Sequence, residues 1–96
     1  MSPDTAMVTL RLFGPLRNAV GHEEVQLPCV GASVKETLVR LAEEWGDTVR
    51  AFIFDRQGNQ VRSLILMQND EPVEDSKATV VGAGDVVSVL LPLAGG

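Results

Sequence analysis

Apolar and polar side chains alternate in the segment MVTLRLF at 7–13. Alternation with a period of two is typical of a β-strand that has one buried face. The segment EEVQLP at 23–28 repeats the pattern over a shorter stretch, and the Gly-Pro pair at 14–15 interrupts the chain between them. The sequence therefore predicts two neighbouring strands that form a hairpin, joined by a loop that runs to Gly21.

The spacing of apolar residues becomes helical in GASVKETLVRLAEEWG at 31–46. Ser33 and Glu36 have the S-x-x-E spacing of a capping box, in which two side chains satisfy free N–H groups at the start of a helix. Apolar residues then recur every three or four positions and form one stripe: Val34, Leu38, Leu41 and Trp45. We expect an amphipathic helix that ends at Gly46, a residue suited to the position just past a helix.

The second half of the chain contains two more strand patterns, SLILMQ at 63–68 and VVSVLL at 86–91. The last strand is apolar on both faces, as expected for the middle of a sheet. The segment 47–54 is apolar enough for a short extra helix or a packed turn, and the polar segment 71–78 is predicted to be irregular. The order β-β-α-β-β predicts an α+β domain, a mixed sheet with one main helix packed on one face.

Length and composition restrict the class of protein. The 96 residues predict one small domain over 1–96, with a loose arm at 1–6 and a flexible tail at 92–96. The net charge of −5 argues against binding to nucleic acid, which depends on Lys and Arg. A single cysteine, Cys29, allows no internal disulfide and favours a reducing compartment, so we expect a cytoplasmic protein. We expect neither a secretory signal nor a membrane span, and a monomer until a partner binds.

Side chains suited to metal binding or nucleophilic catalysis are scarce. His22 is the only histidine and Cys29 the only cysteine, so we expect no metal site and no Cys–His nucleophile. The segment GAGD at 82–85 is too short for a phosphate-binding fingerprint and is predicted to be a turn. The acidic residues within 71–75 lack the spacing of a calcium loop. We therefore do not expect an enzyme that works alone.

The chain ends in PLAGG at 92–96. When extended, five residues reach about 17 Å at roughly 3.3 Å each. Gly95 and Gly96 have no side chains and fit a narrow channel, and the α-carboxylate of Gly96 becomes reactive once ATP converts it to an acyl-adenylate. A persulfide can then attack to give a thiocarboxylate, or an amine to give an amide. We expect this tail to be the functional part of the protein.

In this order the elements resemble the MoaD/ThiS group of ubiquitin-like sulfur carriers, which have the β-grasp fold. The resemblance covers nearly the whole chain and is carried by LFGPLRNAVG, the capped helix, FDRQGNQVR, GAGDVVSVL and the terminal PLAGG. It implies that Gly96 carries the transferable sulfur and that Gly95 enters the active site of a ubiquitin-activating-type adenylyltransferase with it. That partner uses ATP, and the chain itself binds no cofactor. The turn Asn69-Asp70 departs from the family's usual Asn-Gly, although both sequences can form a tight turn.

A partner enzyme also needs a surface beside the tail. The last two predicted strands hold more apolar residues than one helix-covered face requires. Ser88 indicates which side of the last strand is less buried, so we predict partner-binding roles for Leu90, Leu93 and Ala94. In the third strand the alternation does not choose between two pairs: Leu64 with Leu66, or Ile65 with Met67. The alternative is that all of these residues belong to the core or contact the segment 47–54.

Arg17 is a further partner-binding candidate, because it matches a basic residue often found in the first loop of the family. Its alternative is an ordinary solvent-exposed arginine.

Three functions then stay open. The first is a sulfur carrier, for molybdopterin with a molybdopterin synthase large subunit as acceptor, or for cysteine, tRNA or another thio-metabolite. The second is a ubiquitin-like modifier joined to lysines, and the third is a β-grasp interaction module with an inert tail.

Overall fold

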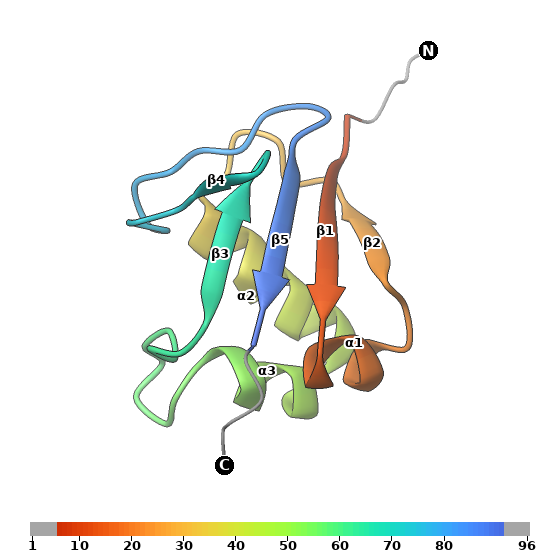
Figure 1. The fold of residues 1–96 in the computed structure, drawn as a ribbon, viewed down its shortest axis with the longest axis vertical. Helices are drawn as coiled ribbons and strands as arrows, with labels where there is room; N and C mark the ends of the chain where they lie inside the picture. Colours follow the sequence, from red (N-terminus) through yellow and green to blue (C-terminus); the bar gives the residue numbers. More distant parts are fainter. Residues whose placement is uncertain (1–5, 92–96) are drawn as a thin grey trace.

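The computed structural model describes residues 6–91, which form one five-stranded mixed sheet of order β2-β1-β5-β3-β4 (Figure 1). The strands are β1 (Val8–Phe13), β2 (Glu24–Leu27), β3 (Ile65–Gln68), β4 (Glu71–Pro72) and β5 (Val86–Leu90). β1 is antiparallel to β2 and parallel to β5, and β3 is antiparallel to both β5 and β4. The predicted hairpin and the central place of the last strand are confirmed. The expected tail, and all but the last residue of the expected arm, lie outside the described residues.

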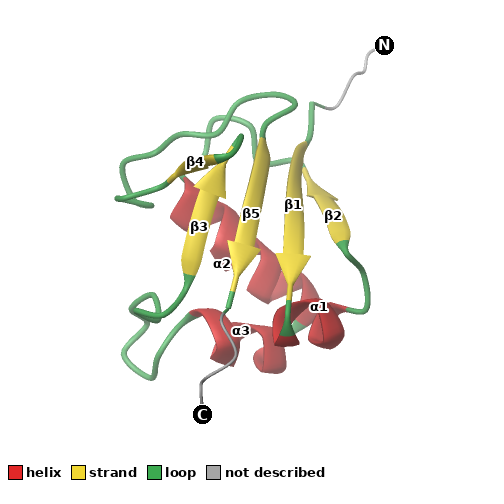
Figure 2. Cartoon of the chain, in the orientation of Figure 1, coloured by secondary structure: helices red, strands yellow, loops and turns green. Residues whose placement is uncertain are grey.

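Three helices accompany the sheet: α1 (Pro15–Val20), α2 (Val34–Trp45) and α3 (Asp47–Ile53). The main helix, α2, crosses behind the sheet, whereas α1 and α3 lie at the end where β1 and β5 finish (Figure 2). The predicted capping box of α2 is present, because the Glu36 N–H donates to Ser33 Oγ at 3.0 Å and the Ser33 N–H donates to Glu36 Oε1 at 2.8 Å. None of these three described helices is long and apolar enough to cross a membrane.

The core lies between α2 and the sheet face that it covers. The strand residues buried in it are Val8, Leu10, Leu12, Val25, Leu27, Leu66, Val87 and Val89. They meet the predicted stripe of α2, of which Val34, Leu38 and Leu41 are fully buried and Trp45 is packed at the edge. Burying one such aliphatic side chain contributes about 1.5–3 kcal/mol. The core therefore needs the strict alternation of β1 and the four-three-four spacing of α2 together.

The loop predicted to run to Gly21 is wrong, because this stretch contains the helix α1. The helix begins at Pro15, whose ring suits the first helical position, and ends where the Gly21 N–H donates to the Arg17 carbonyl at 2.8 Å. Leu16 and Val20 are buried in the core. A six-residue helix is too short to show a convincing period in the sequence, and packing of its two apolar residues stabilises it.

Two other segments show how far local patterns reach. The segment 47–54 was predicted to be a short helix or a packed turn. It forms the helix α3, in which Val49 and Ile53 are buried. The segment 71–78 was expected to be irregular, but it begins with the two-residue strand β4. Pairing with β3 creates this strand, since Met67 faces Pro72 across the ladder. The remainder of that segment contains only bends and turns.

The turn between β3 and β4 is as tight as expected. Asn69 and Asp70 have φ values of 51° and 71°. Positive φ at both central residues is what a two-residue type I′ hairpin turn requires, and Asn and Asp tolerate it better than other residues with side chains. The Asn69 side chain also accepts a hydrogen bond from the Val86 N–H at 2.9 Å. It thereby ties the turn to the start of the central strand.

Asp85 ends the predicted GAGD turn and holds it against this hairpin. Its carboxylate accepts hydrogen bonds from the Asn69 and Gln68 side-chain amides, both at 3.0 Å, and from the Gly82 N–H at 2.6 Å. These donors, the Asn69 side chain first and the Gly82 backbone next, lower the pKa of Asp85 below its ordinary value. The ionised Asp85 therefore fixes the start of β5 relative to the β3–β4 turn.

We expect Ser33→Ala to lower the free energy of unfolding by about 1 kcal/mol, because the substitution leaves the Glu36 N–H without its side-chain acceptor. Urea unfolding followed by circular dichroism measures the effect. Ser63→Ala, at an exposed position in the loop before β3, is the matched control and should change the stability by less than about 0.5 kcal/mol. Equal losses in the two variants would show that the capping box does not stabilise the domain.

We expect Asp85→Asn to lower the free energy of unfolding at pH 7 by about 1–2 kcal/mol, because an amide offers one acceptor oxygen where three donors converge. A lowered pKa stabilises the folded state above the ordinary pKa, and this stabilisation is lost as the pH falls through the folded-state pKa. The difference from the unchanged protein should therefore be constant near neutrality and shrink below about pH 4. Asp70→Asn, at the exposed hairpin turn, should show neither effect. A pH-independent difference would contradict the assignment.

Candidate functional site

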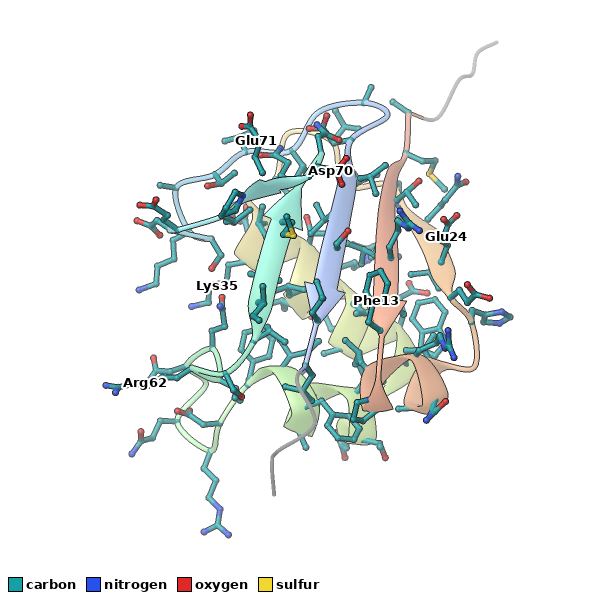
Figure 3. All side chains as sticks on the ribbon, viewed as in Figure 1. Phe13, Glu24, Lys35, Arg62, Asp70 and Glu71 are labelled. Atoms are coloured by element: carbon teal, nitrogen blue, oxygen red, sulfur yellow. The ribbon has the colours of Figure 1, made fainter. Side chains whose placement is uncertain are left out.

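The sheet face opposite α2 carries a row of apolar side chains at the end where β5 finishes. Leu90 pairs with Phe13 of β1 on one side and with Ile65 of β3 on the other. Phe13 is 37% exposed and Ile65 is 49% exposed, and Leu90 between them is half-buried. Among the described residues no helix covers this face, and Figure 3 shows the Phe13 ring on the side turned towards the viewer. We call Phe13, Leu90 and Ile65 the apolar row.

The next row of the same face is partly polar. Ser88 pairs with Arg11 and with Met67, and these long side chains leave it only 9% exposed. The Arg11 guanidinium lies 3.5 Å from the carboxylate of Glu24 and 5.8 Å from the centre of the Phe13 ring. The prediction from Ser88 is thus correct about the face, although Ser88 itself is covered. The apolar row is bordered by a cation that can also contact a partner.

The structure chooses between the two alternatives for the third strand. Leu64 and Leu66 are buried in the core, while Ile65 is exposed and Met67 half-buried on the open face. The alternative that all four residues belong to the core is wrong. The alternation in the segment 7–13 puts Phe13 on the face opposite Val8, Leu10 and Leu12, but Phe13 is not among the site residues predicted from the sequence. The signal was available, since a large aromatic residue stood at an otherwise polar set of positions.

Of the residues predicted to act at the end of the chain, Leu90 alone is described. It lies on the open face at the last position of β5, as predicted. Leu93, Ala94, Gly95 and Gly96 lie outside the described residues. Leu91, which follows Leu90 and is the last described residue, is half-buried and packs against the core. The described part of the chain therefore ends directly beside the apolar row.

Arg17 lies on α1 and not in the apolar row. Its side chain is exposed and lines an open surface depression of about 320 Å³, together with Asn18, Gly21, His22 and Glu23. α1 stands at the end of the sheet where β5 finishes, so Arg17 and Leu90 are at the same end of the molecule (Figure 1).

The remaining candidate groups are not arranged for chemistry. Cys29 is buried, and burial raises the pKa of its thiol, which disfavours the reactive thiolate. The described residues contain no group of three or more His, Cys, Asp or Glu side chains that could hold a metal ion. In residues 6–91 the clearest candidate surface is the exposed apolar row.

Solved structures with the same fold include several small proteins of known type. Residues of SAMP1 from Haloferax volcanii superpose with a TM-score of 0.83 at 21% identity, covering 94% of this chain and 99% of that one. A Pyrococcus furiosus protein assigned as molybdopterin converting factor, subunit 1 superposes with a TM-score of 0.71 at 20% sequence identity. The superposition covers 92% of this chain and 99% of that one. A chain of the Amycolatopsis orientalis BexX/CysO complex superposes with a TM-score of 0.72 at 24% sequence identity. The superposition covers 93% of this chain and 99% of that one. These similarities confirm the β-grasp, ubiquitin-like fold.

Comparison with curated protein sequences gives no match. The model of the ThiS family, in contrast, matches residues 10–96, which include every described strand and helix from Leu10 onwards. The match also extends over the Gly-Gly end on which the resemblance was based. This chain therefore belongs to the ThiS family of ubiquitin-like sulfur carriers.

Proposed function

We propose that this protein carries sulfur on its C-terminal residue, with the Gly96 α-carboxylate adenylated by an ATP-dependent, ubiquitin-activating-type enzyme and then converted to a thiocarboxylate. Small carriers of the ThiS and MoaD type are substrates of other enzymes and not catalysts. The observation that carries the proposal is the exposed apolar row at the end of β5, directly before the PLAGG segment.

The apolar row gives the activating enzyme a place to bind. Phe13, Leu90 and Ile65 come from three adjacent strands, so they form a continuous surface held by the sheet ladder. Large apolar side chains at the centre of an interface contribute most of its binding energy. Binding there brings the tail to the enzyme, and a tail of five residues spans about 17 Å at 3.3 Å per residue.

The reaction needs no side chain of this chain. The Gly96 carboxylate attacks the α-phosphorus of ATP and displaces pyrophosphate, which gives the acyl-adenylate. The terminal sulfur of a cysteine persulfide on the partner attacks the acyl carbon, and AMP leaves. A thiol then reduces the resulting acyl disulfide, which releases the thiocarboxylate and leaves a disulfide. Glycine at both final positions keeps the acyl carbon unhindered for each attack.

The proposed destination of the sulfur is molybdopterin, with a molybdopterin synthase large subunit as the accepting enzyme. The P. furiosus protein of similar fold supports this route, because it is assigned to molybdopterin conversion. The similar fold in the BexX/CysO complex supports transfer to another acceptor in the same way. In each route this chain supplies the sulfur and the partner supplies the catalytic groups.

A second candidate function is conjugation to lysines of other proteins. It is favoured by the similarity to small archaeal modifier protein 1, the SAMP1 of H. volcanii, at a TM-score of 0.83. The same acyl-adenylate would react with an amine, so the amide and the thiocarboxylate share their first step. Tryptic peptides that carry Gly-Gly remnants on lysine would support conjugation.

We expect intact-mass spectrometry to detect replacement of one oxygen by sulfur at Gly96 after incubation with the activating enzyme from the same genome, ATP and a sulfur donor. A variant that lacks Gly96 should show no mass change, because the shortened tail places the carboxylate one residue away from its required position. Intact mass of the protein from its native host checks that the chain ends at Gly96. If the shortened variant also acquires sulfur, Gly96 is not the specific carrier residue. If deletion of Gly95 and Gly96 leaves the cellular phenotype unchanged, an interaction module with an inert tail is the better account.

We expect Ile65→Ala and Leu90→Ala each to raise the KM for the activating enzyme about tenfold, because each removes apolar surface from the centre of the docking site. Pyrophosphate release at varied carrier concentration measures KM. Val80→Ala is the matched control, since Val80 is 62% exposed but lies outside the apolar row and should leave KM unchanged. Equal KM values for all three variants would exclude the apolar row as the docking surface.

A further inference from the structure

We infer that a backbone contact between Gly14 and Leu91 sets the direction in which the tail leaves the domain, and that Gly14 is therefore a positioning residue for tail activation. An ideal Cβ built on Gly14 would lie 3.1 Å from the carbonyl oxygen of Leu91. That separation is tighter than nine in ten real Cβ contacts, so a side chain at position 14 would push one of the two segments away by a few tenths of an ångström. The inference rests on the proposed function, because the tail is the group that reacts.

The contact follows from the parallel pairing of β1 with β5. Phe13 and Leu90 are register partners at the ends of these strands, so the residues that follow them, Gly14 and Leu91, meet. The two chains must then separate, and Gly14 turns away with φ 67° and ψ −142°. This backbone region is open essentially to glycine alone. Glycine is thus required twice, for the turn and for the space in front of Leu91.

If a methyl group were added at Gly14, Leu91 is the side that would move. The Gly14 carbonyl accepts hydrogen bonds from the N–H groups of Arg17 at 3.1 Å and Asn18 at 3.3 Å, and these bonds begin α1. Leu16 is fully buried, so α1 cannot shift away without opening the core. Leu91, in contrast, lies one residue beyond the end of the β5 ladder and is half-buried. The least-held partner is therefore the residue from which the tail continues.

A displacement at Leu91 is passed on to the tail. The next residue is a proline, and a residue before proline is restricted to extended conformations, so Leu91 has little freedom to absorb a change. The reacting carboxylate is five residues further on, and the position of Leu91 sets the region that these five residues can reach. A misplacement of about 1 Å at a reacting atom can cost up to about a hundredfold in rate.

The test compares Gly14→Ala with Gly46→Ala. Gly46 is a close match, because it has φ 95° and ψ −168°, precedes a short helix as Gly14 does, and has nothing within 4 Å of its ideal Cβ. Both variants carry the backbone strain of a side chain at positive φ, and only the first contacts Leu91. In the adenylation assay we expect Gly14→Ala to lower kcat about tenfold at an unchanged KM, because the docking surface is intact. Gly46→Ala should keep both values.

Equal kcat values in the two folded variants would overturn the inference. A second readout does not depend on the activating enzyme. The backbone amide NMR signals of Leu90 and Leu91 should shift in Gly14→Ala and stay in place in Gly46→Ala. If the two variants give the same signals for Leu90 and Leu91, the contact is overturned. If the unchanged protein is not adenylated, the proposed function fails while the NMR comparison still decides the inference. If Gly14→Ala does not fold, Leu91→Gly is compared with Leu91→Ala, because both lose the side chain and only glycine frees the backbone whose carbonyl faces Gly14. A lower kcat in Leu91→Gly alone supports the inference, and equal kcat values overturn it.

Discussion

The parallel pairing of β1 with β5 is the contact on which the functional end of this molecule depends. It brings the first and last strands together in the middle of the sheet and makes them finish at the same edge. Leu90 therefore lies between Phe13 and Ile65, and Leu91 lies against the turn at Gly14. Because β5 is bonded on both sides, its end is held more firmly than an edge strand would be. The proposed docking surface and the proposed starting point for the tail both depend on this one pairing.

Within residues 6–91 the helices cover one face of the sheet only, and this asymmetry separates stability from the proposed function. Val87 and Val89 point to α2 and are fully buried, whereas Leu90 points to the other face, as do its neighbours in the apolar row. Substitutions on the α2 side would remove core packing and lower the free energy of unfolding. Changes on the open face remove surface that water already reaches in part, so a binding surface can vary there without unfolding the domain. The Asp85 hydrogen bonds stabilise the opposite end of the sheet, away from the apolar row.

A protein that carries a reactive group for other enzymes has a simple physical task. It must present one unhindered carboxylate at a fixed distance from a surface that the partner recognises. The buried, raised-pKa thiol of Cys29 is not suited to that task, and the described side chains form no group of three or more His, Cys, Asp or Glu that could hold a metal ion. In the proposed function, the folded part of the chain would contribute recognition and direction, while the partner would contribute ATP, the sulfur donor and the catalytic groups.

Local patterns were sufficient for the elements that repeat over many residues. The alternation of β1, the capping box and stripe of α2, and the apolar β5 were all readable from the sequence, because each has a period that a window of residues reveals. The helix α1 and the strand β4 could not be predicted from the sequence, because both are short and are stabilised by contacts with distant segments. The same reason applies to the site: the sequence indicated the face of Leu90, but Phe13, Ile65 and the Gly14–Leu91 contact depend on which strands are neighbours. Strand order is a long-range property, and no stretch of adjacent residues contains it.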